Sequence, residues 1–103
     1  MTYETKVAIL GAGVTGMCAA HYLSELLGRE SVLVLEASQV PGGTTRTESI
    51  DGFRLDWGPN GFLDREPLTL KWVDDLGLTD SLVRSNEAAA KRFNLKNGNL
   101  VEI

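Results

Sequence analysis

The feature that most constrains this chain is a cluster of three glycines between an apolar run and an amphipathic segment. The apolar run, Lys6–Leu10, leads directly into Gly11–Gly16. A short continuous apolar run is typical of a strand buried on both faces, so Lys6–Leu10 is predicted to be a central parallel strand. The segment Val14–Leu27 carries apolar residues at intervals of three and four, which predicts an amphipathic helix, and Gly28 offers its C-terminal cap. The glycines are therefore predicted to form a tight turn from strand to helix.

The order of residues in this turn is Gly-x-Gly-x-x-Gly, which in this position is the fingerprint of dinucleotide binding. Gly11 permits the tight turn, Gly13 leaves room for a pyrophosphate, and Gly16 allows close approach of helix and strand. The N-terminus of the helix directs N–H groups and a partial positive charge toward the phosphates. We therefore expect the phosphates of a dinucleotide to lie over this turn.

An acidic residue at the end of the second predicted strand supports the same interpretation. This strand is Ser31–Glu36, and Glu36 lies 20 residues after Gly16. A carboxylate at that place accepts hydrogen bonds from both ribose hydroxyls of an adenosine and repels a 2′-phosphate. The strand, helix, strand and acid together favour NAD or FAD over NADP, and a plain NAD-binding module remains an alternative to a flavoprotein.

The rest of the chain is predicted to form a loop, two hairpins and a second helix. The loop covers residues 37–47, and Asp-Gly and Asn-Gly pairs typical of hairpin turns follow it. The predicted elements are a hairpin of Thr45–Ile50 and Phe53–Asp56 around Asp51-Gly52, a helix Pro67–Leu76 capped by Glu66 or Asp64 and ended by Gly77, a helical turn Asp80–Val83 capped by Thr79, and a hairpin of Arg92–Leu95 and Leu100–Ile103 around Asn97-Gly98. The expected fold class is α/β, with a parallel βαβ unit and added β-hairpins.

Length and charge exclude several classes of protein. A chain of 103 residues has room for one domain at most. Its net charge of −4 argues against a nucleic-acid partner, because no broad cationic surface can form. A single cysteine, Cys18, cannot form an internal disulfide and predicts no metal cluster. No apolar run approaches the roughly 20 residues of a membrane span.

Several motifs after the second strand resemble those of one enzyme family. The segment Glu36–Thr47, with Gly42-Gly43 and then Arg46, resembles the second cofactor motif of the flavin amine oxidase superfamily. Further segments resemble the protoporphyrinogen oxidase branch of that superfamily: Phe53–Phe62, Asp75–Leu78, Lys91–Phe93 and Lys96–Leu100. The resemblance covers nearly the whole chain and implies an FAD/NAD(P)-binding Rossmann-like fold with FAD as the cofactor.

The resemblance also implies which residues contact the ligands. The cofactor-binding residues that it implies are Gly11, Ala12, Gly13, Val14, Thr15, Gly16, Glu36, Ala37, Gly42, Gly43, Thr44, Arg46, Gly58, Pro59, Asn60 and Gly61. Of these, Gly58–Gly61 would approach the flavin, although a simple turn also explains Gly58-Pro59. Arg46 would steady the loop or touch the cofactor. Arg92 matches a position that faces a carboxylate of the tetrapyrrole substrate, although a solvated charge explains it equally well. No catalytic residue is assigned.

Three positions depart from the family pattern. Val40 stands where the family usually has a basic residue, and Thr44 stands where some relatives have an aromatic residue. Asn60 replaces an arginine found in some protoporphyrinogen oxidases. These departures weaken the transfer of individual residue roles to this chain.

The activity implied by the resemblance belongs to a longer enzyme. That enzyme would oxidise protoporphyrinogen IX or a related porphyrinogen in haem biosynthesis, with FAD as cofactor and O2 as final oxidant, in the cytoplasm with peripheral membrane association. Residues 1–103 would be the N-terminal part of its FAD-binding domain, without the substrate domain and the C-terminal FAD-binding segment. The isolated chain is expected to bind FAD or ADP weakly and to be inactive. The alternatives are another flavin amine oxidase or carotenoid desaturase, and a non-catalytic protein of the GDP dissociation inhibitor type.

Overall fold

The structure is a computed structural model, and it describes residues 2–103. The chain divides into two compact units, Met1–Arg65 and Glu66–Ile103. The first unit holds β1 (Val7–Leu10), α1 (Val14–Leu27), the 3₁₀ helix η1 (Arg29–Ser31), β2 (Val32–Leu35), β3 (Thr47–Ile50) and β4 (Phe53–Asp56). The second unit holds α2 (Pro67–Asp75), the 3₁₀ helices η2 (Thr79–Ser81) and η3 (Glu87–Ala90), β5 (Phe93–Lys96) and β6 (Asn99–Glu102).

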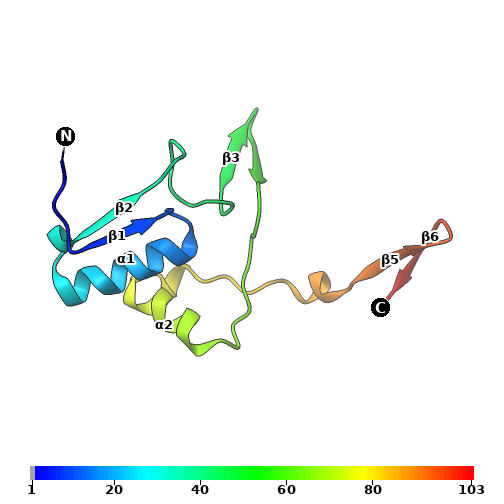
Figure 1. The fold of residues 1–103 in the computed structure, drawn as a ribbon. Helices are drawn as coiled ribbons and strands as arrows, with labels where there is room; N and C mark the ends of the chain where they lie inside the picture. Colours follow the sequence, from blue (N-terminus) through cyan, green and yellow to red (C-terminus); the bar gives the residue numbers. More distant parts are fainter. Residues whose placement is uncertain (1) are drawn as a thin grey trace. The chain divides into compact units, whose positions relative to one another are not determined.

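The N-terminal part of the first unit is a strand–helix–strand motif. Strands β1 and β2 are parallel, with a register that runs from Val7 opposite Val32 to Leu10 opposite Leu35. Helix α1 connects them and lies along one face of the pair (Figure 1). The helix has the predicted bounds, and the residue that follows it, Gly28, is its C-cap and has a positive φ of 89°, which favours glycine. The predicted βαβ unit is therefore confirmed.

The expectation that the first strand is central and buried on both faces is wrong for the residues described. Within residues 2–103, β1 pairs with β2 alone, and α1 covers one face of that two-stranded sheet. On the other face Leu10 is 82% exposed and Leu35 is 48% exposed. Helix α1 likewise leaves Leu26 79% exposed, so part of its predicted apolar stripe has no cover. The apolar run correctly identified a strand, but the first unit, as far as it is described, leaves the second face of that strand exposed.

Both predicted hairpins are present, although β3 begins at Thr47 rather than Thr45, and β5 and β6 each lie one residue closer to their turn than predicted. The turns explain the register of both hairpins. Asp51 and Gly52 connect β3 to β4, and Asn97 and Gly98 connect β5 to β6. All four residues have positive φ, at 50°, 83°, 53° and 78° respectively. Two successive positive φ values define the type I′ turn, which matches the twist of the flanking strands.

The second helix is confirmed with a small difference at its end, because it stops at Asp75 and Leu76 is its C-cap residue. Helix α2 begins with Pro67, and Glu66 is its N-cap residue. The Glu66 side chain makes no capping hydrogen bond, so the helix start depends on the fixed φ of Pro67. Neither α1 nor α2, the two α-helices of residues 2–103, is long and apolar enough to cross a membrane.

The short helical turn after α2 was predicted with the wrong bounds. It is the 3₁₀ helix η2, and Thr79 is its first residue rather than its cap. The Thr79 hydroxyl instead donates to Asp74 Oδ1 at 2.8 Å, which ties η2 to the end of α2. The 3₁₀ helix η3 was not predicted; Asn86 caps it by accepting the Ala88 N–H at 2.9 Å.

Candidate functional site

The site begins at the turn between β1 and α1. Gly11 has a φ of 96°, which favours glycine, and its N–H donates to Leu35 O at 2.7 Å. Gly13 is the N-cap residue of α1. The first turn of α1 has no side-chain cap and no acidic residue. Because the first N–H groups of a helix have no partner within it, this turn leaves polar hydrogens available to an anion.

The glycines of this turn have separable roles. A Cβ added to Gly16 would overlap the Gly11 carbonyl oxygen and lie 3.1 Å from the Gly11 carbonyl carbon. Gly16 therefore permits the close approach of α1 to the end of β1. A Cβ added to Gly13 would meet no atom within 4 Å. Gly13 thus leaves open space beside the turn, as a pyrophosphate site requires.

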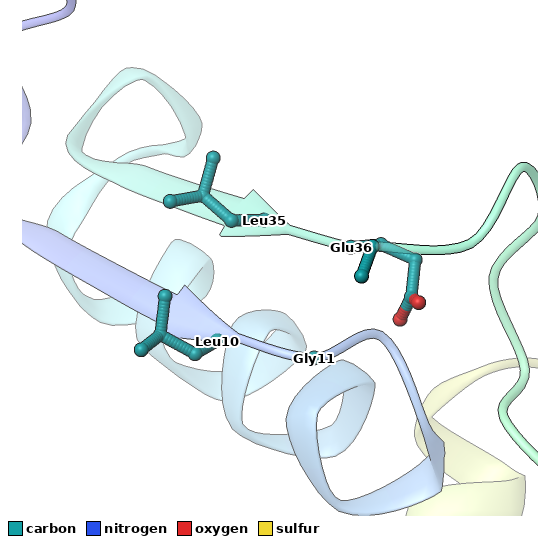
Figure 2. A pocket seen from close by; sticks show the side chains of 5 residues that line it. Leu10, Gly11, Leu35 and Glu36 are labelled. Atoms are coloured by element: carbon teal, nitrogen blue, oxygen red, sulfur yellow. The ribbon is translucent and has the colours of Figure 1, made fainter.

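Glu36 follows β2 and directs its carboxylate toward the turn (Figure 2). Its Oε2 accepts the Ala12 N–H at 2.7 Å, and its Oε1 accepts both the N–H and the hydroxyl of Ser38 at 2.8 Å. The backbone N–H of Ser38, the N–H of Ala12 and the Ser38 hydroxyl, in that order, lower the pKa of Glu36 to about 2. The carboxylate is therefore ionised at neutral pH and stays an acceptor.

Ala12 is the junction of three segments. Besides its N–H bond to Glu36, its carbonyl oxygen accepts the Gly42 N–H at 2.7 Å. Ala12 is only 3% exposed. A Cβ built on Gly43 would lie 3.3 Å from Gly13 Cα, so the second glycine pair packs against the first turn. The structure thus brings together Gly11–Gly16, Glu36 and Gly42-Gly43, as the sequence predicted.

A hollow of about 420 Å³ lies at the carboxyl ends of the two parallel strands. It is lined by Leu10, Gly11, Leu35, Glu36 and Ala37. The two leucines point to one side of the sheet, while the Glu36 carboxylate points the other way, toward the glycine turn (Figure 2). The hollow is therefore shallow, open to solvent and mainly apolar, with Glu36 at its border.

Arg46 lies at the base of the β3–β4 hairpin. Its guanidinium carbon is 5.1 Å from the centroid of the Trp57 ring, and its carbonyl accepts the Trp57 N–H at 2.8 Å. The Trp57 indole N–H donates to Glu48 Oε2 at 2.9 Å. Of the two roles expected for Arg46, these contacts favour steadying the loop.

The remaining predicted site residues lie in four places. Val14 and Thr15 are exposed in the first turn of α1. Gly58 packs on the second glycine loop, because a Cβ there would overlap the Thr44 carbonyl oxygen. Pro59, Asn60 and Gly61 are exposed after β4. Arg92 belongs to the second unit, where it is exposed and its carbonyl accepts the Ile103 N–H at 2.9 Å.

Ser38 is a residue of this site that the sequence interpretation missed. It provides two of the three hydrogen bonds to the Glu36 carboxylate described above. A serine two residues after a carboxylate at the end of a strand is a local pattern in which backbone and side chain can bond that acid. This spacing was the signal that could have identified it.

The pKa of Glu36 predicts how acid affects the turn. Its ordinary pKa of 4.5 falls to about 2 in the folded chain, so ionised Glu36 stabilises the fold. That contribution is complete above about pH 4.5 and is lost as the pH falls through about 2. The free energy of unfolding in urea should thus differ between the natural chain and Glu36→Gln at pH 6, and the difference should shrink toward pH 2.

The matched control for this titration is Glu25→Gln, an exposed carboxylate of α1 outside the turn. It corrects for the loss of one negative charge. A difference between the natural chain and Glu36→Gln that stays constant from pH 6 to pH 2 would contradict the hydrogen-bonded carboxylate.

Comparison with known proteins gives a consistent result. Residues 9–76 match the family model described as NAD(P)-binding Rossmann-like domain. The chain is 35% identical over 88 residues to coproporphyrinogen III oxidase of Staphylococcus aureus, covering 85% of the chain and 19% of that protein. It is 37% identical over 101 residues to chloroplastic protoporphyrinogen oxidase 1 of Arabidopsis thaliana, covering 96% of the chain and 18% of that protein. The chain therefore spans about a fifth of the length of these relatives.

A solved structure is similar along nearly the whole chain. It is a crystal structure from Exiguobacterium sp. 255-15 of a protein assigned as a protoporphyrinogen oxidase, with a TM-score of 0.80 and 29% sequence identity. The match covers 99% of this chain and 22% of that one. The Rossmann-like α/β fold expected from the sequence is therefore confirmed.

Proposed function

The chain belongs to the NAD(P)-binding Rossmann-like domain family, and from that premise we propose that it is the FAD-binding portion of a porphyrinogen oxidase. The observation that carries the proposal is the direction of the Glu36 carboxylate. It bonds the Ala12 N–H inside the glycine turn and borders the hollow at the strand ends. A carboxylate so placed can accept ribose hydroxyls while the adjoining helix N-terminus receives the phosphates.

The residues present fit the ADP half of FAD. The open space beside Gly13 admits a pyrophosphate close to the backbone, and the N–H groups of Val14 and Thr15 begin α1 beside it. Glu36 is ionised and has acceptor capacity for ribose. Leu10 and Leu35 give the hollow an apolar wall suited to a flat heterocycle. Ala12 has a different role, because both of its backbone groups bond within the protein and hold the site together.

The second glycine loop supports FAD over NAD. Gly42-Gly43 contacts the turn directly, and Gly58 packs against Thr44 of that loop. The exposed segment Pro59–Gly61 follows and can reach toward the flavin end of the cofactor. FAD held by these residues would supply hydride-accepting chemistry, with O2 as the final oxidant.

The substrate part of the proposal rests on the relatives. Two of them are named for the oxidation of coproporphyrinogen III and protoporphyrinogen. Arg92 is the residue of this chain that we assign to a substrate carboxylate, because an exposed guanidinium binds a carboxylate through two parallel hydrogen bonds. The substrate is thus a porphyrinogen with propionate groups, and peripheral membrane association of the whole enzyme belongs to the same proposal.

The nucleotide site is tested by calorimetric titration of the chain with ADP, FAD, NAD and NADP. We expect FAD and ADP to bind, and NADP to bind more weakly than NAD because Glu36 repels its 2′-phosphate. Glu36→Ala should weaken ADP binding roughly 10- to 100-fold, because hydrogen bonds from the ribose to a charged acceptor are lost. The same variant should reduce the preference for NAD over NADP.

The control for this titration is Glu48→Ala, since Glu48 lies in the β3–β4 hairpin and bonds Trp57. A chain that binds NAD well and FAD no better would favour the alternative of a plain NAD-binding module. The oxidase activity is tested on the longest natural protein that contains this sequence. Flavin absorbance after purification and a panel of coproporphyrinogen III, protoporphyrinogen IX and simple amines separate a porphyrinogen oxidase from an amine oxidase.

A further inference from the structure

The Ser38 hydroxyl lies between two acceptors. Its Oγ is 2.8 Å from Glu36 Oε1 and 2.7 Å from the Val40 carbonyl oxygen. A hydroxyl has one hydrogen to donate, a carbonyl oxygen has none, and Glu36 is ionised at neutral pH. At any moment the hydroxyl therefore donates to Glu36 or to Val40, but not to both.

The acceptor positions of Glu36 are nearly filled. An ionised carboxylate offers about four lone-pair positions, two on each oxygen. On Oε1 both are taken by the N–H and the hydroxyl of Ser38. On Oε2 one is taken by the Ala12 N–H, and the Ala37 N–H also bonds the carboxylate as its weakest donor. At most one position is thus left for a ligand, whereas a ribose presents two hydroxyl groups.

We propose that Ser38 is a specificity-determining residue of this site, whose hydroxyl turns from Glu36 to the Val40 carbonyl when a ribose with both hydroxyls binds. The inference rests on the proposed nucleotide-binding function. The first ribose hydroxyl uses the one position that remains. The second takes the place on Oε1 that the serine hydroxyl leaves, and the serine remains hydrogen-bonded because Val40 O is already within reach.

This exchange sets how strongly the site prefers a diol. If the ligand lacks one hydroxyl, Ser38 keeps its hydrogen bond to the charged oxygen, and little binding free energy is lost. If the ligand has both, Ser38 exchanges a charge-assisted bond for a neutral one, which is about half as strong. Removing the serine hydroxyl removes this cost, so the preference for the full diol should increase. A serine that only held Glu36 in place would have the opposite effect.

The experiment is a calorimetric titration of the full chain with ADP, 2′-deoxy-ADP and 3′-deoxy-ADP. In Ser38→Ala, the ratio of the dissociation constant of at least one deoxy nucleotide to that of ADP should rise about fivefold over the natural chain. Ser38→Thr keeps a hydroxyl and should restore the natural ratio. Ser49→Ala, an exposed serine of β3, is the matched control and should leave the ratio unchanged.

A second measurement needs no ligand. The pKa of the Glu36 carboxyl, followed by NMR, should rise in Ser38→Ala and not in Ser38→Thr, because the serine hydroxyl helps to lower it. An unchanged pKa in Ser38→Ala would overturn the proposal. The proposal would also be overturned if the ratio of dissociation constants, deoxy nucleotide to ADP, were unchanged or reduced in Ser38→Ala while ADP still binds. That result would leave the proposed nucleotide site itself standing. Absence of ADP binding in the natural chain would refute the nucleotide site and this inference together.

Discussion

Replacing Gly16 with alanine should unfold the strand–helix–strand motif under conditions in which the natural chain is folded. The new Cβ would overlap the Gly11 carbonyl oxygen, which is a backbone atom of a tight turn and can shift only if the turn itself shifts. Alanine favours a helix over glycine by up to about 1 kcal/mol, but overpacking against fixed atoms costs about 3 kcal/mol or more. The net loss is a large part of the total stability of a small chain.

The measurement for Gly16→Ala is urea unfolding followed by far-ultraviolet circular dichroism. The midpoint should shift strongly to lower urea. Gly61→Ala is the matched control, because a Cβ there meets no atom within 4 Å and the backbone is not in the left-handed region. An unfolding midpoint of Gly16→Ala equal to that of Gly61→Ala would show that α1 does not approach the turn as closely as described.

Replacing Gly13 with alanine should give the opposite result: a folded chain that has lost its ligand. Gly13 has a φ of −73°, which alanine adopts without strain, and its Cβ would meet no protein atom within 4 Å. The open space beside it is where we place the pyrophosphate. A methyl group there would push the phosphates away from the backbone and weaken their charge-assisted hydrogen bonds to its N–H groups. ADP and FAD affinity should therefore fall roughly 10- to 100-fold.

Calorimetric titration and urea unfolding of Gly13→Ala are needed together. The unfolding midpoint should stay close to that of the natural chain, with a small decrease because alanine is a weaker N-cap residue than glycine. Adenosine, which has no phosphate, serves as the control ligand and should lose little affinity. Unchanged ADP binding would show that the phosphates do not lie over Gly13.

Most of the secondary structure could be predicted because its causes are local. The repeat of apolar residues in Val14–Leu27 and the cap at Gly28 fixed α1 to the residue. The Asp51-Gly52 and Asn97-Gly98 pairs fixed both hairpins through their positive φ values. The bounds of η2 were wrong because Thr79 bonds Asp74 in the preceding helix instead of capping its own turn. Whether Thr79 bonds Asp74 or caps its own turn depends on where the C-terminal end of α2 places the Asp74 carboxylate.

The sequence also identified the glycines and the acid of the candidate site, because their spacing around a strand and a helix is itself the signal. The way these parts are joined was not predictable. The Ala12 N–H donates to Glu36, which lies 24 residues away, and the Ala12 carbonyl accepts the Gly42 N–H. Arg46 packs on the Trp57 ring. Nothing in the residue types reveals these partners.

What the sequence alone determined is therefore the identity of the elements and the kind of turn between them, since both follow from interactions among near neighbours. Only the tertiary structure decided that the Glu36 carboxylate reaches the Ala12 N–H in the turn, and that Leu10 remains exposed on the second face of the sheet. Each of these depends on the path of the chain between distant residues. A hydrogen bond forms only when that path brings donor and acceptor within about 3 Å of each other.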